Sequence, residues 1–201
     1  MVSSSGKNRK DQIMDEALAL FITKGFQETT IEDILAATGI ARGTLYYHFQ
    51  GKAEIMMQII NRTAEEIAQR ARLVANQEMD FPMKFLSVVQ AAQVSGPAQD
   101  LVSDMHDTPN AEFHIQSVIK TVEKLAPILG DVIAEGIAAG SCTSPQPERD
   151  AEILLTAGFI LPDQGFFPAT SQLSATRVRS LFAAAERLLE LSPGTFTGFF
   201  A

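Results

Sequence analysis

The feature that most constrains this chain is the stretch Thr29–Lys52, which reads TTIEDILAATGIARGTLYYHFQGK. Thr30 is followed three residues later by Asp33, which is the spacing of a capping box with Asp in place of the usual Glu or Gln. We therefore expect a helix to begin near Ile31. Gly39 then supplies the backbone freedom that a sharp turn needs. The stretch predicts a short helix, a tight turn and a second short helix.

The second helix is expected to span about Ala41 to Phe49 and to carry an outer face that the core does not need. At roughly 100° per residue, Ala41, Leu45 and Phe49 fall on one inward stripe. The other residues face outward or lie on the flanks, namely Arg42, Gly43, Thr44, Tyr46, Tyr47 and His48. This outer face indicates contact with another molecule.

A third helix has to cover these two, because helices this short cannot bury enough apolar surface alone. The preceding stretch provides apolar residues at helical spacing, namely Ile13, Ala17, Leu20 and Phe21. Gly25 follows where a C-terminal cap is expected, and Phe26 can pack back onto the domain. The pattern predicts a three-helix domain whose helix-turn-helix presents its second helix to a major groove of DNA.

The run GFQETTIEDILAATGIARGTLYYHFQGKAEI resembles the amino-terminal DNA-binding domain of the TetR family of transcriptional repressors, and the match is close over residues 10–60. The resemblance rests on the combined order of Gly25, Thr29, Thr30, Ile34, Gly39, Gly43, Thr44, Leu45, Tyr46, Tyr47, His48, Phe49 and Lys52. Each of these positions also has a separate physical role in the predicted domain. The two lines of reasoning agree.

The resemblance implies two groups of DNA contacts. The residues expected to approach base edges are Arg42, Gly43, Thr44 and Tyr46. The residues expected to hold the phosphate backbone are Thr30, Tyr47, His48 and Lys52. The chemistry is suitable, because arginine can donate two hydrogen bonds to guanine O6 and N7, while tyrosine hydroxyls and lysine suit phosphate oxygens.

Each DNA contact has a structural alternative. Tyr46 and Tyr47 could be ordinary surface aromatics that pack against the next helix, and His48 could be a structural residue beside an apolar face. Lys52 could be a solvated charge, although the helix dipole disfavours a cation at a helix start. Glu32 lies early in the first of the two helices, where members of the family often have a residue that contacts a base or a phosphate. A carboxylate departs from this pattern, because phosphate repels it. We expect Glu32 to face away from DNA.

The resemblance also implies an all-α fold with two domains. We place the three-helix DNA-binding domain at residues 1–52 and a larger helical domain for ligand binding and dimerisation at 53–201. A linking helix is expected over about 52–76. Pro127 should kink or restart the helix that contains it. The further helical spans are predicted at about 82–95, 99–107, 110–139, 148–167 and 175–191.

A net charge of −8 opposes binding to the DNA polyanion, but the distribution of the charge removes the conflict. Residues 1–52 hold six Lys and Arg against six Asp and Glu. The negative excess therefore lies entirely in residues 53–201. A DNA-binding N-terminal domain is compatible with this charge pattern.

Composition and cysteine content suggest a cytoplasmic globular protein. The 201 residues include 46% hydrophobic and 20% charged residues, which suits a sizeable core. No stretch approaches the roughly 20 apolar residues of a membrane span, and the start MVSSSGKNRK lacks the apolar run of a signal peptide. The single cysteine, Cys142, excludes an internal disulfide and a metal site built from cysteines. We expect no cofactor.

The last two helices, over about 148–191, are expected to form a homodimer. One apolar stripe consists of Val178, Leu181, Phe182, Ala185, Leu188 and Leu189. A second stripe with small residues consists of Ala151, Leu154, Leu155, Gly158 and Phe159. The resemblance implies that this pair packs against its copy as a four-helix bundle, which would set two reading helices about 34 Å apart. The alternative is that both stripes belong to the internal core.

The middle helices are the candidate site for a small-molecule effector. Their apolar candidates are Phe85, Val88, Val89, Met105, Phe113, Val118, Phe159 and Phe166. Polar groups that could orient a ligand are His106, His114 and Gln90. Plain core is the alternative for each residue. The resemblance implies a largely apolar inducer that binds here and changes the spacing of the two reading helices.

Three other classes of function fit the sequence less well. A metal site would use Asp104, His106, Asp107, Glu112 and His114, but Pro109 breaks the register between the histidines and no known ligand pattern is present. A nucleophilic enzyme would need a His and an acid beside Ser141 or Cys142, and none can be named. A helical adaptor for other proteins would leave Tyr46, Tyr47 and Lys52 unexplained. We therefore expect no enzyme and no metal site, but a ligand-responsive repressor that binds a palindromic operator as a homodimer.

Overall fold

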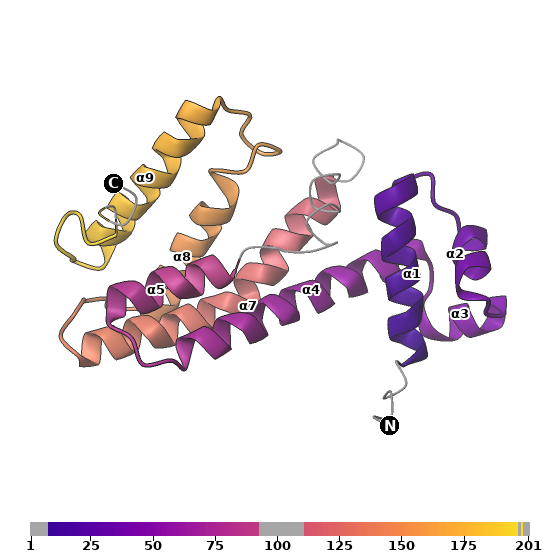
Figure 1. The fold of residues 1–201 in the computed structure, drawn as a ribbon, viewed down its shortest axis with the longest axis horizontal. Helices are drawn as coiled ribbons and strands as arrows, with labels where there is room; N and C mark the ends of the chain where they lie inside the picture. The colour runs from indigo at the N-terminus through magenta and orange to yellow at the C-terminus, as the bar shows by residue number, and fades with distance from the viewer. Residues whose placement is uncertain (1–7, 93–110, 197, 199–201) are drawn as a thin grey trace, which may run out of the picture. The chain divides into compact units, whose positions relative to one another are not determined.

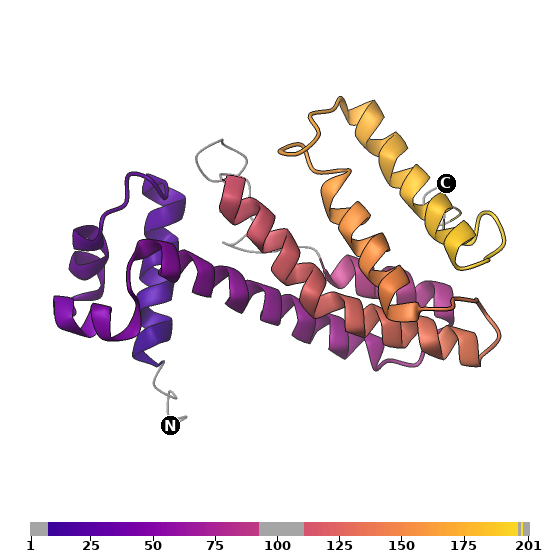
Figure 2. The same cartoon turned by 180° about the vertical axis from the view of Figure 1, so that it is seen from behind.

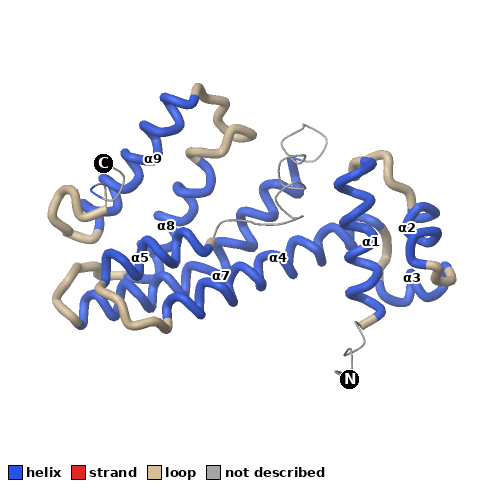
Figure 3. The backbone as a smooth tube through the Cα atoms, viewed as in Figure 1, coloured by secondary structure: helices blue, strands red, loops and turns tan. Residues whose placement is uncertain are grey.

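The computed structural model of this chain describes residues 8–92, 111–196 and 198. The described part consists of helices joined by turns and loops, with no strand in it (Figure 3). The predicted all-α fold class is confirmed. The predicted span 99–107 lies outside the described residues.

The chain divides into two compact units. The first unit contains the described residues of 1–63 and 95–116, and the second contains those of 64–94 and 117–201. Helices α4 (Lys52–Ala75) and α7 (Ala111–Ala138) contribute residues to both units. The functional division that we expected at residue 52 coincides with the first residue of α4 and stays a prediction.

The first unit is built on the predicted three-helix plan (Figure 1). Its helices are α1 (Arg9–Lys24), α2 (Ile31–Thr38), α3 (Arg42–His48) and the first part of α4. Gly25 and Gly39 end α1 and α2 with φ angles of +87° and +66°, which L side chains rarely adopt. The apolar side chains that meet in the core include Ile13, Ala17, Phe21, Ile34, Leu45, Phe49, Ile55 and Ile59.

The predicted capping box is confirmed at the start of α2. The Thr30 hydroxyl accepts a hydrogen bond from the Asp33 backbone N–H at 3.1 Å, and the Asp33 carboxylate accepts one from the Thr30 backbone N–H at 2.8 Å. Lys24 also donates to this carboxylate, at 2.6 Å. The Lys24 hydrogen bond, and after it the Thr30 hydrogen bonds, hold the pKa of Asp33 well below its ordinary value. The start of α2 is therefore well defined.

The second unit packs the later part of α4 against α5 (Phe81–Ala91), α7, α8 (Pro147–Ile160) and α9 (Ser171–Leu188). Both views show α4 and α7 side by side (Figures 1 and 2), and Lys124 of α7 forms a 2.9 Å ion pair with Glu65 of α4. Buried residues from all these helices form one apolar cluster, which includes Ile67, Phe81, Phe85, Leu125, Leu129, Ile133, Leu155 and Leu189.

The apolar C-terminal tail docks on the second unit as far as Phe196. This ring is fully buried and stacks on Phe85 with 4.7 Å between the ring centroids. The buried carboxylate of Glu186 accepts hydrogen bonds from the backbone N–H of Phe196 at 2.7 Å and of Gly194 at 3.1 Å. These two hydrogen bonds replace the ones that the backbone N–H groups of the tail would otherwise make with water. Phe199 and Phe200 lie outside the described residues.

The predicted ends of α8 and α9 are wrong by several residues. Helix α8 ends at Ile160 rather than near Phe167, and α9 begins at Ser171 rather than near 175. Between them, the Asp163 carboxylate accepts a hydrogen bond from the Gly165 N–H at 2.8 Å and forms a turn. These local side-chain hydrogen bonds compete with helix formation, which apolar spacing alone does not reveal.

Pro127 does not restart α7, which continues as one helix from Ala111 to Ala138. The proline removes one backbone N–H, so the carbonyl of Glu123 loses its helical partner. Both Pro127 and Glu123 are exposed. Water can therefore hydrate this carbonyl, which explains why the helix tolerates the proline.

Gly136 offers a direct test of the packing between α5 and α7. A Cβ at this position would lie 2.4 Å from Cδ2 of the buried Phe81 ring and 2.9 Å from Sγ of Cys142. We expect Gly136→Ala to lower the free energy of unfolding by about 1–3 kcal/mol, because the ring would have to move within a filled core. The measurement is denaturant unfolding at fixed protein concentration.

The matched control is Gly158→Ala, in α8. A Cβ there meets no atom within 4 Å, so helix propensity should make this change neutral or stabilising by up to about 1 kcal/mol. Equal destabilisation by the two alanines would contradict the packing seen at Gly136.

Candidate nucleic-acid interface

Helix α3 is anchored by two buried residues and exposes the opposite face. Leu45 is fully buried and Phe49 almost so. Tyr47 is 84% exposed and Tyr46 is 47% exposed. Both tyrosines were predicted to face outward, and this exposure is confirmed. Two large aromatic side chains therefore lie on the surface of a helix whose inner face is fully packed.

Ala41 is not part of the inward stripe, and that prediction is wrong. Ala41 is the exposed N-cap residue of α3, with extended backbone angles, and the helix begins at Arg42. The prediction extended helical geometry one residue too far, to Ala41. Helix ends are the least reliable part of a periodicity argument, because the backbone leaves the 100° step there.

The start of α3 is open to approach by another molecule. A Cβ built at Gly43 would meet no atom within 4 Å, so packing inside the chain does not demand a glycine. Arg42 and Gly43 are exposed, and Thr44 is half-buried. A close external partner, such as a DNA base edge, would give the small residue a purpose.

His48 lies between two aromatic rings. Its ring centroid is 5.0 Å from that of Tyr47, in an edge-on arrangement, and 6.3 Å from that of Phe49. The side chain is half-buried. His48 therefore packs edge-on against the exposed Tyr47, and its predicted phosphate contact stays a prediction.

Arg42 and Glu32 form an ion pair between α3 and α2. A terminal nitrogen of the guanidinium donates to the Glu32 carboxylate. A hydrogen bond from the backbone N–H of Glu32, followed by the contact with Arg42, lowers the pKa of this carboxyl below its ordinary value. We expected Glu32 only to face away from DNA, whereas it contacts the arginine expected to read bases.

Lys52 holds the turn between α1 and α2. Its ammonium donates to the backbone carbonyls of Phe26, Gln27 and Thr29 at 2.7, 2.9 and 2.9 Å. The same ammonium lies 4.6 Å from the centroid of the Phe26 ring. An ammonium has three N–H donors, and all three are used here. The predicted phosphate contact of Lys52 stays a prediction, and in this structure its ammonium has a structural role that the sequence did not indicate.

A residue of α7 joins the core of the first unit. Phe113 packs edge-on against Phe26, with 4.8 Å between the ring centroids, and Phe26 packs in turn on Phe21. We expected Phe113 in an effector site, but it lies in this core instead. The turn that Lys52 holds is therefore also in contact with the first turn of α7.

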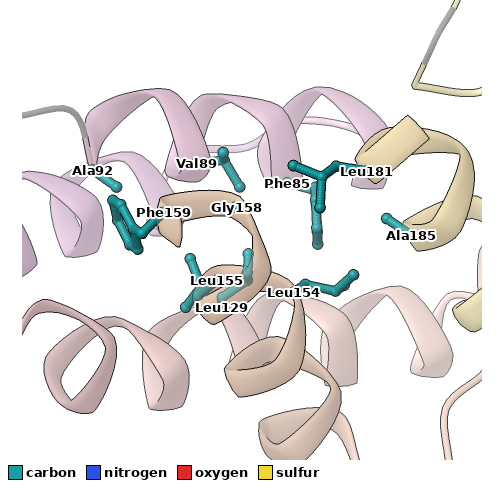
Figure 4. A pocket seen from close by; sticks show the side chains of 10 residues that line it. All are labelled: Phe85, Val89, Ala92, Leu129, Leu154, Leu155, Gly158, Phe159, Leu181 and Ala185. Carbon is teal, nitrogen blue, oxygen red and sulfur yellow. The ribbon is translucent and has the colours of Figure 1, made fainter. Parts of the chain in front are cut away.

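An apolar cavity of about 230 Å³ lies among α5, α7, α8 and α9 of the second unit (Figure 4). It brings together three predicted effector residues, Phe85, Val89 and Phe159. The other lining residues are Ala92, Leu129, Leu154, Leu155, Gly158, Leu181 and Ala185. Every lining residue in the described part of the chain is apolar.

A second hollow, of about 510 Å³, shares Val89, Gly158 and Leu181 with the first. Its polar lining residues are Ser87 and Gln90, and none of the described residues that line it is charged. The two hollows adjoin. Together they form a mainly apolar space with uncharged polar groups at one part of its wall.

Two more of the predicted effector residues, both in the described part of the chain, lie outside these hollows. His114 is buried in the part of α7 that belongs to the first unit, and Phe166 lies half-buried in the loop between α8 and α9. Met105 and His106 lie outside the described residues. The sequence grouped these residues by their chemistry, with apolar side chains to hold a ligand and histidines to orient it, and residue chemistry does not determine which residues meet in space.

Many residues of the two apolar stripes that were expected to form the dimer interface line the cavity of the second unit. These residues are Leu154, Leu155, Gly158, Phe159, Leu181 and Ala185. The large apolar side chains exposed on α8 and α9 are Ile153, Leu173 and Leu188, and Ile153 is 58% exposed. A surface for a second copy would therefore use these outer residues, of which only Leu188 belongs to a predicted stripe.

The described residues contain neither a membrane-spanning helix nor a metal-ligand cluster. None of the described helices has the length and apolar character needed to span a bilayer. Within residues 8–92, 111–196 and 198, no three His, Cys, Asp or Glu side chains come together as metal ligands. Three of the residues weighed for a metal site, Asp104, His106 and Asp107, lie outside those ranges.

Comparison with known families gives a match in the first unit. Residues 13–59 match the profile of a family described as "Bacterial regulatory proteins, tetR family". This range contains α2, α3 and most of α1. The resemblance inferred from the sequence is confirmed.

Similar proteins cover more of the chain. An HTH-type transcriptional repressor, KstR2 of Rhodococcus jostii, is 27% identical over 148 residues, which are 70% of this chain and 72% of KstR2. The negative transcriptional regulator IcaR of Staphylococcus aureus is 43% identical over 51 residues, 25% of this chain and 27% of IcaR. A TetR/AcrR-family regulator from Thermobifida fusca has the same fold, with a TM-score of 0.62 at 18% identity, over 87% of this chain and 97% of that one. These relatives are DNA-binding regulators, not enzymes.

Lys52 can be tested by its effect on stability. We expect Lys52→Gln to lower the free energy of unfolding by about 2–4 kcal/mol, because three carbonyls lose a charged donor. Lys24→Gln is the control, since it removes one charge from an exposed ion pair with Asp33 and should change stability little. Thermal and denaturant unfolding measure both. A Lys52→Gln protein as stable as the wild type would refute the structural role.

Proposed function

This chain belongs to the TetR family of bacterial regulatory proteins, and on that basis we propose that it is a ligand-responsive transcriptional repressor. It binds a palindromic DNA operator as a homodimer, and a small-molecule inducer releases it. It acts in the cytoplasm, where bacterial DNA lies. The choice of repressor over activator is supported by KstR2 and IcaR, which are described as a repressor and a negative regulator.

One observation supports DNA binding above the others, namely the exposed face of α3. Tyr46 and Tyr47 lie on the surface, while the buried Leu45 and Phe49 already anchor the helix. In the major groove such a face can meet base edges and phosphates at once. A helical adaptor that binds only proteins has no use for the open space at Gly43.

We assign two kinds of DNA contact to the exposed face of α3 and to the residues around it. Arg42, Gly43, Thr44 and Tyr46 approach base edges. Thr30, Tyr47 and His48 contact the phosphate backbone, with Thr30 also serving as the cap of α2. Lys52 supports the surface by holding the preceding turn, and a phosphate contact by Lys52 would require it to release a carbonyl.

Dimerisation is proposed through α8 and α9. The exposed apolar residues Ile153, Leu173 and Leu188 would be covered by the second copy. A twofold axis would place two α3 helices about 34 Å apart, which is one turn of DNA. One short reading helix in each subunit is then sufficient for a palindromic site.

Release is proposed to follow from ligand binding in the cavity of the second unit. Its apolar lining favours a largely apolar effector, with Ser87 and Gln90 available for one uncharged polar group. A ligand can weaken DNA binding only through its preference for the conformation that binds DNA poorly. The effector must therefore fit that conformation better.

The DNA-binding proposal is tested by selecting bound duplexes from a random pool. We expect the wild-type dimer to enrich a palindrome, and Arg42→Ala to relax the preference at one base position per half-site at a cost of about 1–3 kcal/mol. If roughly eight phosphates are neutralised per dimer, log affinity should fall with log salt at a slope near −7. No enriched sequence, or an affinity insensitive to salt, would count against the proposal. Sedimentation measures the oligomeric state of the same samples.

The effector proposal is tested by filling the cavity. Gly158 lines both hollows, and a Cβ at this helical position meets no atom within 4 Å, so Gly158→Leu should fold and occupy the space. We expect the wild type to bind the uncharged apolar dye Nile red with increased fluorescence, and Gly158→Leu to lose that increase. The control is Thr156→Leu, which adds the same side chain at an exposed position of α8 that does not line the cavity. Equal dye binding by Gly158→Leu and wild type would rule out this site.

A further inference from the structure

Two exposed side chains of opposite charge link the two helices of the helix-turn-helix. Arg42 is the first residue of α3, and Glu32 is the second residue of α2. Their side chains are 58% and 64% exposed, and the guanidinium donates directly to the carboxylate. The Glu32 carboxyl is ionised at neutral pH, and its contact with Arg42 contributes to a pKa below the ordinary value. A negative charge therefore lies on the same face as the residues assigned to DNA.

Stability does not explain this pair. Exposed ion pairs contribute little to folding, because water screens them and ordering two long side chains costs entropy. Helices α2 and α3 are in any case held by the buried side chains of Ile34, Leu45 and Phe49. The pair instead determines where the Arg42 guanidinium lies. A free arginine side chain would sample many rotamers and could reach the nearest phosphate.

A phosphate and a guanine differ in how they compete with Glu32. If Arg42 moved to a phosphate, the carboxylate would be left unpaired beside a polyanion, which is unfavourable. A guanine offers two uncharged acceptors, O6 and N7. Because a guanidinium has five N–H donors, Arg42 can donate to guanine and keep its bond to Glu32. The pair thus favours base contact over backbone contact.

We propose that Glu32 is a positioning residue that keeps the Arg42 guanidinium away from phosphates and directs it to a guanine, and so raises the preference for the operator over other DNA. The inference rests on the proposed function, since it requires α3 to lie in the major groove. It gives a purpose to the one residue of α2 that departs from the pattern expected for a DNA-binding helix.

The test is Glu32→Gln, which removes the charge and keeps the size of the side chain. The charge-matched control is Glu28→Gln, at an exposed residue of the turn before α2. Two measurements are made on each variant and on Arg42→Ala. The first is selection of bound duplexes from a random pool, and the second is affinity for a duplex without the operator at several salt concentrations.

We expect Glu32→Gln to weaken the base preference at the same operator position at which Arg42→Ala weakens it. It should also bind the non-operator duplex several-fold more tightly, with a salt slope steeper by about 0.9 for each phosphate that Arg42 now contacts. Glu28→Gln should keep the wild-type base preference and gain less non-operator affinity. Since both glutamates are exposed, all variants should unfold at the wild-type temperature.

The inference is wrong if Glu32→Gln and Glu28→Gln share the wild-type base preference and have equal salt slopes. That failure differs from failure of the proposed function. In the latter case the wild-type protein itself would enrich no palindromic duplex.

Discussion

The N-terminal unit depends on one ammonium group placed on three backbone carbonyls. Lys52 begins α4, while Phe26, Gln27 and Thr29 belong to the turn between α1 and α2. Three backbone carbonyls that point to one place would lack hydrogen bonds without a shared donor. The Lys52 ammonium supplies these hydrogen bonds and so stabilises this path of the turn. That path places the cap of α2, and Gly39 then places α3. The orientation of the whole exposed face therefore follows from a contact that never reaches that face.

The same turn offers a route by which the proposed inducer could act. Phe26, over which Lys52 lies, also packs on Phe113 in the first turn of α7. Helix α7 continues into the second unit, where its residue Leu129 lines the apolar cavity. A ligand that favours one position of α7 would bias the packing of Phe113 and, through Phe26, the turn itself. Coupling of this kind is reciprocal, so DNA would bias the cavity to the same extent.

Sequence reasoning predicted local structure better than it predicted which surface a helix buries. The capping box at Thr30, the left-handed Gly39 and the buried Leu45 follow from neighbours within a few residues, and all three are confirmed. The apolar residues of α8 were expected to face a second copy, and many of them face the cavity instead. Periodicity identifies an apolar side of a helix, but the partner of that side depends on residues distant in sequence.

By itself, the sequence determined the all-α class, the helix-turn-helix with its exposed tyrosines, and the resemblance to the TetR family. Each is encoded by short-range spacing, by capping chemistry or by glycine at a left-handed position. Only the tertiary structure decided that Lys52 holds a turn, that Glu32 pairs with Arg42, and that Phe113 belongs to the N-terminal core. The physical reason is that these contacts join side chains brought together by packing, and a long or aromatic side chain has several possible partners until the backbone path selects one.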